Sequence, residues 1–190
     1  MSHIQKNKMK QILFDVPLWK CPIDPTKIGL ESKNFKNCFD SKTLSSFAGI
    51  NNCTEEGHKY LIETIMNELK KDLKVWKLVN LRAWRNIYKD SFQDRHNHAG
   101  SHFTFIIYEK ILKPQTVFYH PANDLINASE GGDYYKLSHE LEADKDTIFI
   151  FPGYLDHMVR LTKEGMSISG NFDVIPHPNR KLGLDTGAGF

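Results

Sequence analysis

Six runs of β-branched and aromatic residues follow one another from residue 75 onward, and they constrain the fold more than any other feature of the sequence. The runs span residues 75–88, 102–112, 115–120, 147–152, 157–162 and 166–174, and polar turns separate them. Residues of this kind are enriched in β-strands, and runs at this spacing indicate an all-β arrangement rather than alternating strands and helices. We therefore expect a mainly β protein.

One helix is expected before the strand region, between residues 55 and 74. Apolar residues recur there at intervals of three and four, at Tyr60, Leu61, Ile65, Leu69 and Leu73. That spacing produces an amphipathic helix whose apolar stripe needs a partner surface, and Thr54 followed by two glutamates is a suitable N-cap. We expect this helix, with or without a second short helix before it, to pack on the outer face of a sheet.

The chain length limits the number of domains. At 190 residues with 40% apolar content, the chain can bury one core but is too short for two ordinary domains. We expect a single domain, 1–190, with four parts. These are an irregular N-terminal region at 1–54, the helix at 55–74, a β-barrel core at 75–175 and an extended tail at 176–190.

Charge and cysteine content limit the partners and the compartment. There are 25 Lys and Arg against 23 Asp and Glu, and the resulting net charge of +2 indicates neither a nucleic acid nor an anionic membrane as partner. The three cysteines lack Cys-x-x-Cys spacing, which indicates reduced thiols. No stretch approaches the roughly 20 apolar residues of a membrane span. We therefore expect a cytoplasmic protein that does not bind a membrane.

Three histidines in two segments form a candidate metal site. Side chains two residues apart in a strand lie on the same face, so His96 and His98 share a surface, which alternation extends to His102 and Thr104. His157 follows the Pro-Gly corner after a later strand. Two imidazoles at this spacing and a third from a distant strand can hold one ion and leave coordination positions open. The same alternation predicts a polar barrel interior and an apolar exterior.

Several short motifs between Trp84 and Asn171 resemble, in combination, one enzyme family. They are Trp84-x-Asn86-Ile87-Tyr88, His96-x-His98-x-Gly100-Ser101, Ile107-Tyr108, Phe118-x-His120-Pro121, Phe151-Pro152-x-x-x-x-His157 and Ser167-Ile168-Ser169-x-Asn171. This stretch resembles the 2-oxoglutarate- and Fe(II)-dependent oxygenases, in particular small ones from phages and bacteria. The resemblance implies a double-stranded β-helix, which is a jelly-roll or cupin-like barrel. It also implies that the three histidines bind Fe(II) and are catalytic, that 2-oxoglutarate and O2 are cosubstrates, and that the protein is a hydroxylase of a bacterial or phage-infected cell.

The residues that would hold 2-oxoglutarate match the family less fully. The family has an arginine, which pairs with the far carboxylate, where this chain has Gly165. Lys163, Arg160 and Arg82 are equal alternatives for that charge. We expect further hydrogen bonds to the cosubstrate from Ser167, Ser169, Asn171, Asn86, Tyr88 and Tyr108.

Two other functions are compatible with the same residues. A cupin-type metalloprotein that does not use 2-oxoglutarate also has His-x-His and, later, a proline five residues before a histidine, and in that interpretation His102 is a further ligand. A barrel that has lost cosubstrate binding would be a non-enzymatic binding module, which the missing arginine favours. The substrate class is open among peptides, nucleotides and small molecules, the oligomeric state is equally open, and no interleaved basic and aromatic pattern indicates a nucleic acid.

Overall fold

The computed structural model describes residues 16–30, 35–37, 43–46, 53–110, 116–129, 136–142 and 144–178. Within these ranges the strands are β1 (Trp19–Pro22), β2 (Lys36–Asn37), β3 (Leu44–Ser45), β4 (Val75–His96), β5 (Phe103–Lys110), β6 (Thr116–Tyr119), β7 (Ser138–Glu140), β8 (Thr147–Pro152) and β9 (His157–Pro176). The helices are the 3-10 helix η1 (Pro25–Ile28), α1 (Glu55–Leu69) and α2 (Asn123–Ala128). The expected mainly β class is confirmed.

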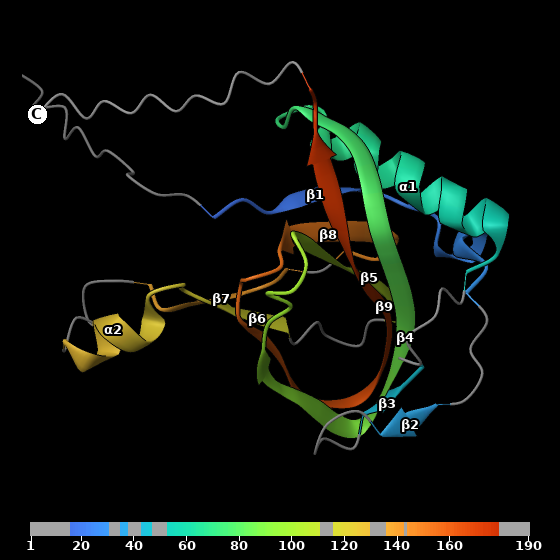
Figure 1. Cartoon of the computed structure of the whole chain (residues 1–190). Coiled ribbons are helices and arrows are strands. Elements are labelled where there is room, and N and C mark those ends of the chain that lie inside the picture. The colour runs from blue at the N-terminus through green and yellow to red at the C-terminus, as the bar shows by residue number, and fades with distance from the viewer. Residues whose placement is uncertain are drawn as a thin grey trace, which may run out of the picture.

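Two sheets share their longest strands. The larger sheet has the order β1-β8-β5-β9-β4-β3-β2, with antiparallel pairing throughout. A smaller sheet forms where the C-terminal part of β4 and the N-terminal part of β9 pair, with β6 on the other side of β9 and β7 beyond it. Figure 1 shows β4 and β9 side by side as they curve from one sheet into the other. Two antiparallel sheets joined in this way form the double-stranded β-helix that was expected.

Strands β4 and β9 are longer than the expected runs. They bend at the places where their pairing is irregular. β4 continues past residue 88 to His96, and β9 joins the two expected runs into one strand. The register between β4 and β9 shifts between Ser91 and Gln93 and again between Gln93 and His96. A bulge increases local twist and bends a strand. As a result, β4 passes into the smaller sheet and brings His96 opposite His157.

The barrel wall separates two apolar clusters. On the outer side of the larger sheet, Phe105 and Ile107 of β5 pack with Leu61 and Ile65 of α1. The inner cluster is formed by Ile106, Tyr108, Phe118, Leu141, Phe149, Phe151 and Leu155. Successive residues of β5 therefore enter opposite clusters, as alternation requires. The apolar exterior is confirmed, whereas the expectation of a polar interior is corrected, because aromatic residues fill part of it.

Helix α1 begins where the sequence predicts and ends earlier. The Gly57 amide donates to the Thr54 hydroxyl at 3.1 Å, which caps the first turn. Leu61, Ile65 and Leu69 are fully buried, and burying each such side chain contributes about 1.5–3 kcal/mol. The helix lies against the outside of the barrel (Figure 1). It ends at Leu69 and is followed by turns, so it is shorter than the expected 55–74.

Short strands before the barrel extend both edges of the larger sheet. In the region expected to be irregular, β1 pairs with β8 at one edge of the larger sheet, while β3 and β2 extend the other edge beyond β4. Of the expected tail at 176–190, residues 179–190 lie outside the described residues. None of the helices in the described ranges has the length and apolar character that crossing a membrane requires.

Candidate metal centre

The three predicted ligands come from two segments that lie side by side. His96 ends β4 and pairs with His157, which begins β9, and His98 lies just beyond the end of β4. The His98 amide donates to the Gly153 carbonyl at 2.7 Å, and the Gly153 amide donates to the His102 carbonyl at 2.9 Å. These bonds fix the segment after β4 to the corner that precedes β9.

The close approach at this corner requires a glycine. A Cβ atom at position 153 would lie 2.2 Å from the Ser101 carbonyl oxygen and 2.8 Å from the His98 carbonyl oxygen. Both oxygens belong to the backbone, so neither can move aside without displacing the segment that carries His98. Gly153 therefore allows the two ligand-bearing segments to meet.

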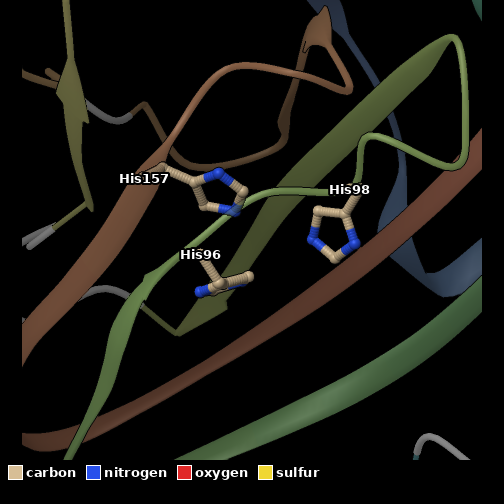
Figure 2. Close-up of side chains that lie close together, drawn as sticks. All are labelled: His96, His98 and His157. Carbon is tan, nitrogen blue, oxygen red and sulfur yellow. The ribbon is translucent and has the colours of Figure 1, made fainter.

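The three imidazole rings surround a common space (Figure 2). The ring centroids lie 4.4 Å apart for His96 and His157, 5.2 Å apart for His96 and His98, and 5.4 Å apart for His98 and His157. One nitrogen of each ring lies within 4.8 Å of the others. Nitrogens this close can converge on a single transition-metal ion, to which imidazole binds at about 2.0–2.1 Å.

Backbone carbonyls orient two of the rings. His96 Nδ1 donates to the Asp94 carbonyl at 2.6 Å, and His157 Nδ1 donates to the Leu155 carbonyl at 3.0 Å. A histidine that donates through Nδ1 has its lone pair on Nε2, and hydrogen bonds of this kind fix the ring orientation of metal ligands. His96 and His157 therefore both present Nε2 as the metal-binding atom.

Burial keeps two of the imidazoles neutral. Desolvation, together with the nearby His96, lowers the pKa of His98 to about 4 and that of His157 to about 3. Both pKa values are well below neutral pH. The two rings are therefore in the neutral form that binds metals.

Residues beside the ligands hold the two segments together. The Arg95 guanidinium contacts Asp156 Oδ2 through Nε at 2.8 Å and through Nη2 at 2.7 Å. The Asn97 amide donates to the other oxygen, Asp156 Oδ1, at 2.7 Å. The Asn97 hydrogen bond and the Arg95 guanidinium lower the pKa of Asp156. We call Arg95, Asn97 and Asp156 the clamp, because it joins the flanks of the His-x-His pair to the flank of His157.

Replacing Asp156 with asparagine is expected to weaken metal binding by about 10- to 100-fold, the range typical when outer contacts of metal ligands are lost. The substitution preserves the shape of the side chain but removes the charge that holds Arg95, so the two ligand segments lose their alignment. Competition with a chromophoric zinc chelator measures the affinity.

The matched control for the clamp is Asp124→Asn. Asp124 contacts Arg95 at 3.1 Å from α2, and its side chain is 79% exposed, so it contributes to the same guanidinium without flanking a ligand. We expect its zinc affinity to stay close to that of the wild type. Unchanged affinity in a folded Asp156→Asn protein would mean that the clamp does not position the ligands.

The triad lines a chamber of about 170 Å³ inside the barrel. The other lining residues are Trp84, Asn86, Gln93, Asn97, Thr104, Phe105, Ile106, Phe151, Val159 and Ser169, so the described wall contains no Lys, Arg, Asp or Glu. Three buried atoms of the described barrel wall have no hydrogen-bond partner, namely Asn86 Oδ1, Thr104 Oγ1 and Ser167 Oγ. Because an unpaired buried polar atom is costly, these atoms indicate the place of a polar ligand.

Some of the expected cosubstrate residues lie at this chamber. Asn86 and Ser169 line it, and Asn86 Nδ2 donates to Ser169 Oγ at 3.0 Å. Ser167 is fully buried and pairs with Asn86 on β4 and with Tyr108 on β5. Asn171 is half-buried and pairs with Thr104.

The two expected tyrosines are buried and engaged with other residues. The Tyr88 hydroxyl donates to Gln93 Oε1 at 3.1 Å. The Tyr108 hydroxyl is hydrogen-bonded to Thr116 Oγ1, and burial raises the pKa of this phenol. Neither tyrosine is among the residues that line the chamber.

The three basic alternatives all lie at the surface. The side chains of Lys163, Arg160 and Arg82 are exposed and line no part of the chamber. Arg160 is paired with Glu140 at 2.7 Å. The structure therefore does not bring these cations to the triad.

His102 is also separate from the triad. Its ring is exposed, and its Nδ1 accepts a hydrogen bond from the Val174 amide at 3.2 Å and lies 3.9 Å from Asp173. Residues 97–102 lie outside the strands, with a turn at residues 99–100. The expectation that His102 shares the surface of His96 is therefore wrong, whereas Thr104, which lies in β5, does line the chamber.

Two of the solved structures that are similar to this chain are oxygenases or hydroxylases by their names. No family model and no curated protein sequence matches the chain. A prolyl-4-hydroxylase from Pseudomonas putida is 14% identical, with a TM-score of 0.46, over 70% of this chain and 72% of that one. An oxidoreductase of the 2OG-Fe(II) oxygenase family from Burkholderia pseudomallei is 13% identical, with a TM-score of 0.45, over 68% and 67% of the two chains. At these values neither structure assigns an activity or a residue role to this chain.

Proposed function

We propose that this protein is a 2-oxoglutarate- and O2-dependent Fe(II) oxygenase that hydroxylates its substrate. The observation that carries the proposal is the convergence of His96, His98 and His157 on the wall of a chamber that contains unpaired polar atoms. A closed structural zinc site has four protein ligands. Three ligands instead leave positions on the ion for a bidentate 2-oxo acid and for O2.

The residues present fit Fe(II) and a 2-oxo acid. Imidazole nitrogens bind iron as well as zinc, copper and nickel. The described triad contains no carboxylate, so the bound ion would keep its full double positive charge. Such a centre attracts an anionic chelator, and a 2-oxo acid binds through one carboxylate and one keto oxygen.

The side chains around the centre would orient the ligands and exclude water. Bound Fe(II), 2-oxoglutarate and O2 supply the oxidation, in which 2-oxoglutarate becomes succinate and carbon dioxide and a substrate C–H bond becomes C–OH. The clamp and the Asp94 and Leu155 carbonyls hold the imidazoles in place. Trp84 and Phe151 form an apolar wall that limits access of water to the reacting groups. Peptides, nucleotides and small molecules are the substrate classes that this proposal includes.

An anaerobic titration of the Fe(II)-loaded protein with 2-oxoglutarate tests the proposal. We expect a weak visible charge-transfer band, because the band arises when a 2-oxo acid chelates iron, and succinate should form once air is admitted. The same titration with zinc in place of iron is the control and should give no band. Iron that binds tightly without producing a band on addition of 2-oxoglutarate would contradict the proposal.

A cupin-type metalloprotein that does not use 2-oxoglutarate is the second candidate. The absence of a basic side chain among the described lining residues favours it, since nothing charged there pairs with a far carboxylate. The position of His102, exposed and bonded to the Val174 amide, does not support it as a fourth ligand. Iron binding without the band is the result that this candidate predicts.

A further inference from the structure

We propose that a second pocket binds a small molecule that carries a phosphate monoester on an apolar group. The pocket forms where residues 16–18, which precede β1, meet the β6–β7 pair, and its volume is about 270 Å³. None of its described lining residues also lines the chamber of the triad. It is therefore a separate site, whose occupant does not depend on the proposed function.

Three nitrogen-bearing side chains line the polar part of the second pocket, namely His120, Lys136 and His139. The Ala122 amide donates to His120 Nδ1 at 3.0 Å. The Lys136 ammonium lies 2.8 Å from His139 Nδ1 and donates to it, because an ammonium has no lone pair. Each ring thus accepts at Nδ1 and carries its proton on Nε2. Both Nε2–H groups remain as donors for a ligand.

The second pocket has a positive charge that no described carboxylate neutralises. Lys136 forms no ion pair within the described ranges, and no Asp or Glu is among the described lining residues. The acids beside the lining residues are paired elsewhere, since Glu140 contacts Arg160 at 2.7 Å and Asp156 contacts Arg95 at 2.7 Å. The pocket is therefore complementary to an anion.

The number of donors favours a phosphate monoester as that anion. The Lys136 ammonium, the two imidazole N–H groups and the hydroxyl of Ser138 all belong to lining residues. A phosphate monoester offers three strong acceptor oxygens and carries a charge of about −1.5 to −2 at pH 7. Hydrogen bonds between charged groups of this kind are about twice as strong as neutral ones. A carboxylate, with two oxygens and one charge, would satisfy fewer of these donors.

The rest of the lining is apolar and suits the group that carries the phosphate. Phe118 and Leu155 are buried, whereas Val16 and Leu18 are exposed apolar side chains. A ligand that covers Val16 and Leu18 removes apolar surface from water, which is favourable. The volume is near the lower end of the range for small-molecule sites, so the apolar group is small, of about the size of one ring.

The second pocket shares a wall with the metal centre. The ring of Phe118 lies 6.1 Å from the ring of His157, and the Leu155 carbonyl accepts the hydrogen bond from His157 Nδ1. One layer of residues thus separates the pocket from a metal ligand. Because phosphate also binds metal ions, a test of the pocket has to distinguish the two positions.

Calorimetric titration of the full-length protein with three probes tests the proposal. Phenyl phosphate has both the phosphate and a ring, inorganic phosphate has only the first, and phenol has only the second. We expect phenyl phosphate to bind at least about tenfold more tightly than either of the others, because charged hydrogen bonds and apolar burial both contribute. Its affinity should agree within about twofold between zinc-loaded and chelator-treated protein. Binding that requires zinc would place the phosphate on the metal and overturn the proposal.

Two variants locate the binding. Lys136→Gln should weaken phenyl phosphate by about tenfold, because it removes the charge, and should leave phenol within about twofold of the wild type. His139→Ala, at an exposed position of β7, removes one donor and should weaken phenyl phosphate severalfold. The matched control is Lys59→Gln, because Lys59 is exposed on α1, on the other side of the barrel from β7 (Figure 1). It should change neither affinity.

The outcomes are distinct from those of the oxygenase assay. Unchanged affinity for phenyl phosphate in both Lys136→Gln and His139→Ala overturns the site, and so does an equal loss in Lys59→Gln. Equal affinity of the wild type for phenol and phenyl phosphate overturns the anion, and equal affinity for inorganic phosphate overturns the apolar group. The charge-transfer band and succinate formation are measured without any phosphate compound, so either proposal can fail while the other holds.

Discussion

Replacing His157 with alanine is expected to abolish metal binding, with a loss of affinity well beyond the roughly 100-fold that outer contacts of a ligand provide. His157 is the only ligand of the described triad that comes from β9, so its removal leaves only His96 and His98, which come from one segment of the chain. Two imidazoles hold an ion far less firmly than three. The metal content after dialysis against iron or zinc measures the effect.

A comparison with His102→Ala shows whether the loss of metal is specific to the ligands of the triad. His102→Ala should retain nearly all of the bound metal, because its ring is exposed and bonded to the Val174 amide. Since His157 is buried and its loss also costs packing, His98→Ala, at a half-buried position, is the second test of the triad. Equal metal loss for His102→Ala and His157→Ala would move the ligand set toward the cupin interpretation. Circular dichroism spectra establish that each variant is folded.

The ligands could be predicted from the sequence because strand geometry acts over short distances. His96 ends β4 and His98 lies just beyond the strand, so the alternation of a strand indicated that the two rings lie close together, as they do. The strand β8 was also expected with its observed bounds, since Thr147 to Pro152 is a short apolar run between turns. The pairing of His96 with His157 depends on the long-range register of β4 and β9, and only the motif resemblance indicated that the two segments meet.

The limits of the sequence patterns also have physical causes. Alternation failed for His102 because the chain leaves the strand after His96 and turns before β5. The polar stretch after residue 88 has the composition of a loop, yet β4 continues through it because β9 supplies backbone partners. The short β1 has no alternating pattern of its own and is defined by pairing with β8.

The residues of the clamp could not be identified from the sequence alone. Arg95 and Asp156 are ordinary charged residues in the sequence, and a surface charge is most often simply solvated. Their one distinguishing signal is that each stands directly beside a predicted ligand. That signal could have identified them only after the two ligand segments were known to be neighbours, as the structure shows.

Replacing Gly170 with alanine is expected to destabilise the protein by about 3 kcal/mol, the upper end of the usual range for overpacking a core. Gly170 lies on β9 between Phe105 of β5 and Ala83 of β4. A Cβ atom there would lie 2.3 Å from the Arg82 carbonyl oxygen and 2.3 Å from the Phe105 ring. The ring is fully buried in the cluster under α1, and the oxygen belongs to the backbone of β4. Urea unfolding should therefore show a lower midpoint with an unchanged slope.

Gly100→Ala is the matched control, because a Cβ atom at position 100 would have nothing within 4 Å. The free energy of unfolding of this variant should therefore stay within about 0.5 kcal/mol of that of the wild type. A Gly170→Ala protein as stable as this control would show that β4 and β9 are not packed as described.

Adding zinc to both variants extends the test to the metal site. A metal that binds only the folded state adds about 2.7 kcal/mol at 100 times its dissociation constant, which would offset most of the loss if the triad is intact. A smaller gain in Gly170→Ala than in Gly100→Ala would mean that packing on the outer side of the barrel also determines the positions of the histidines.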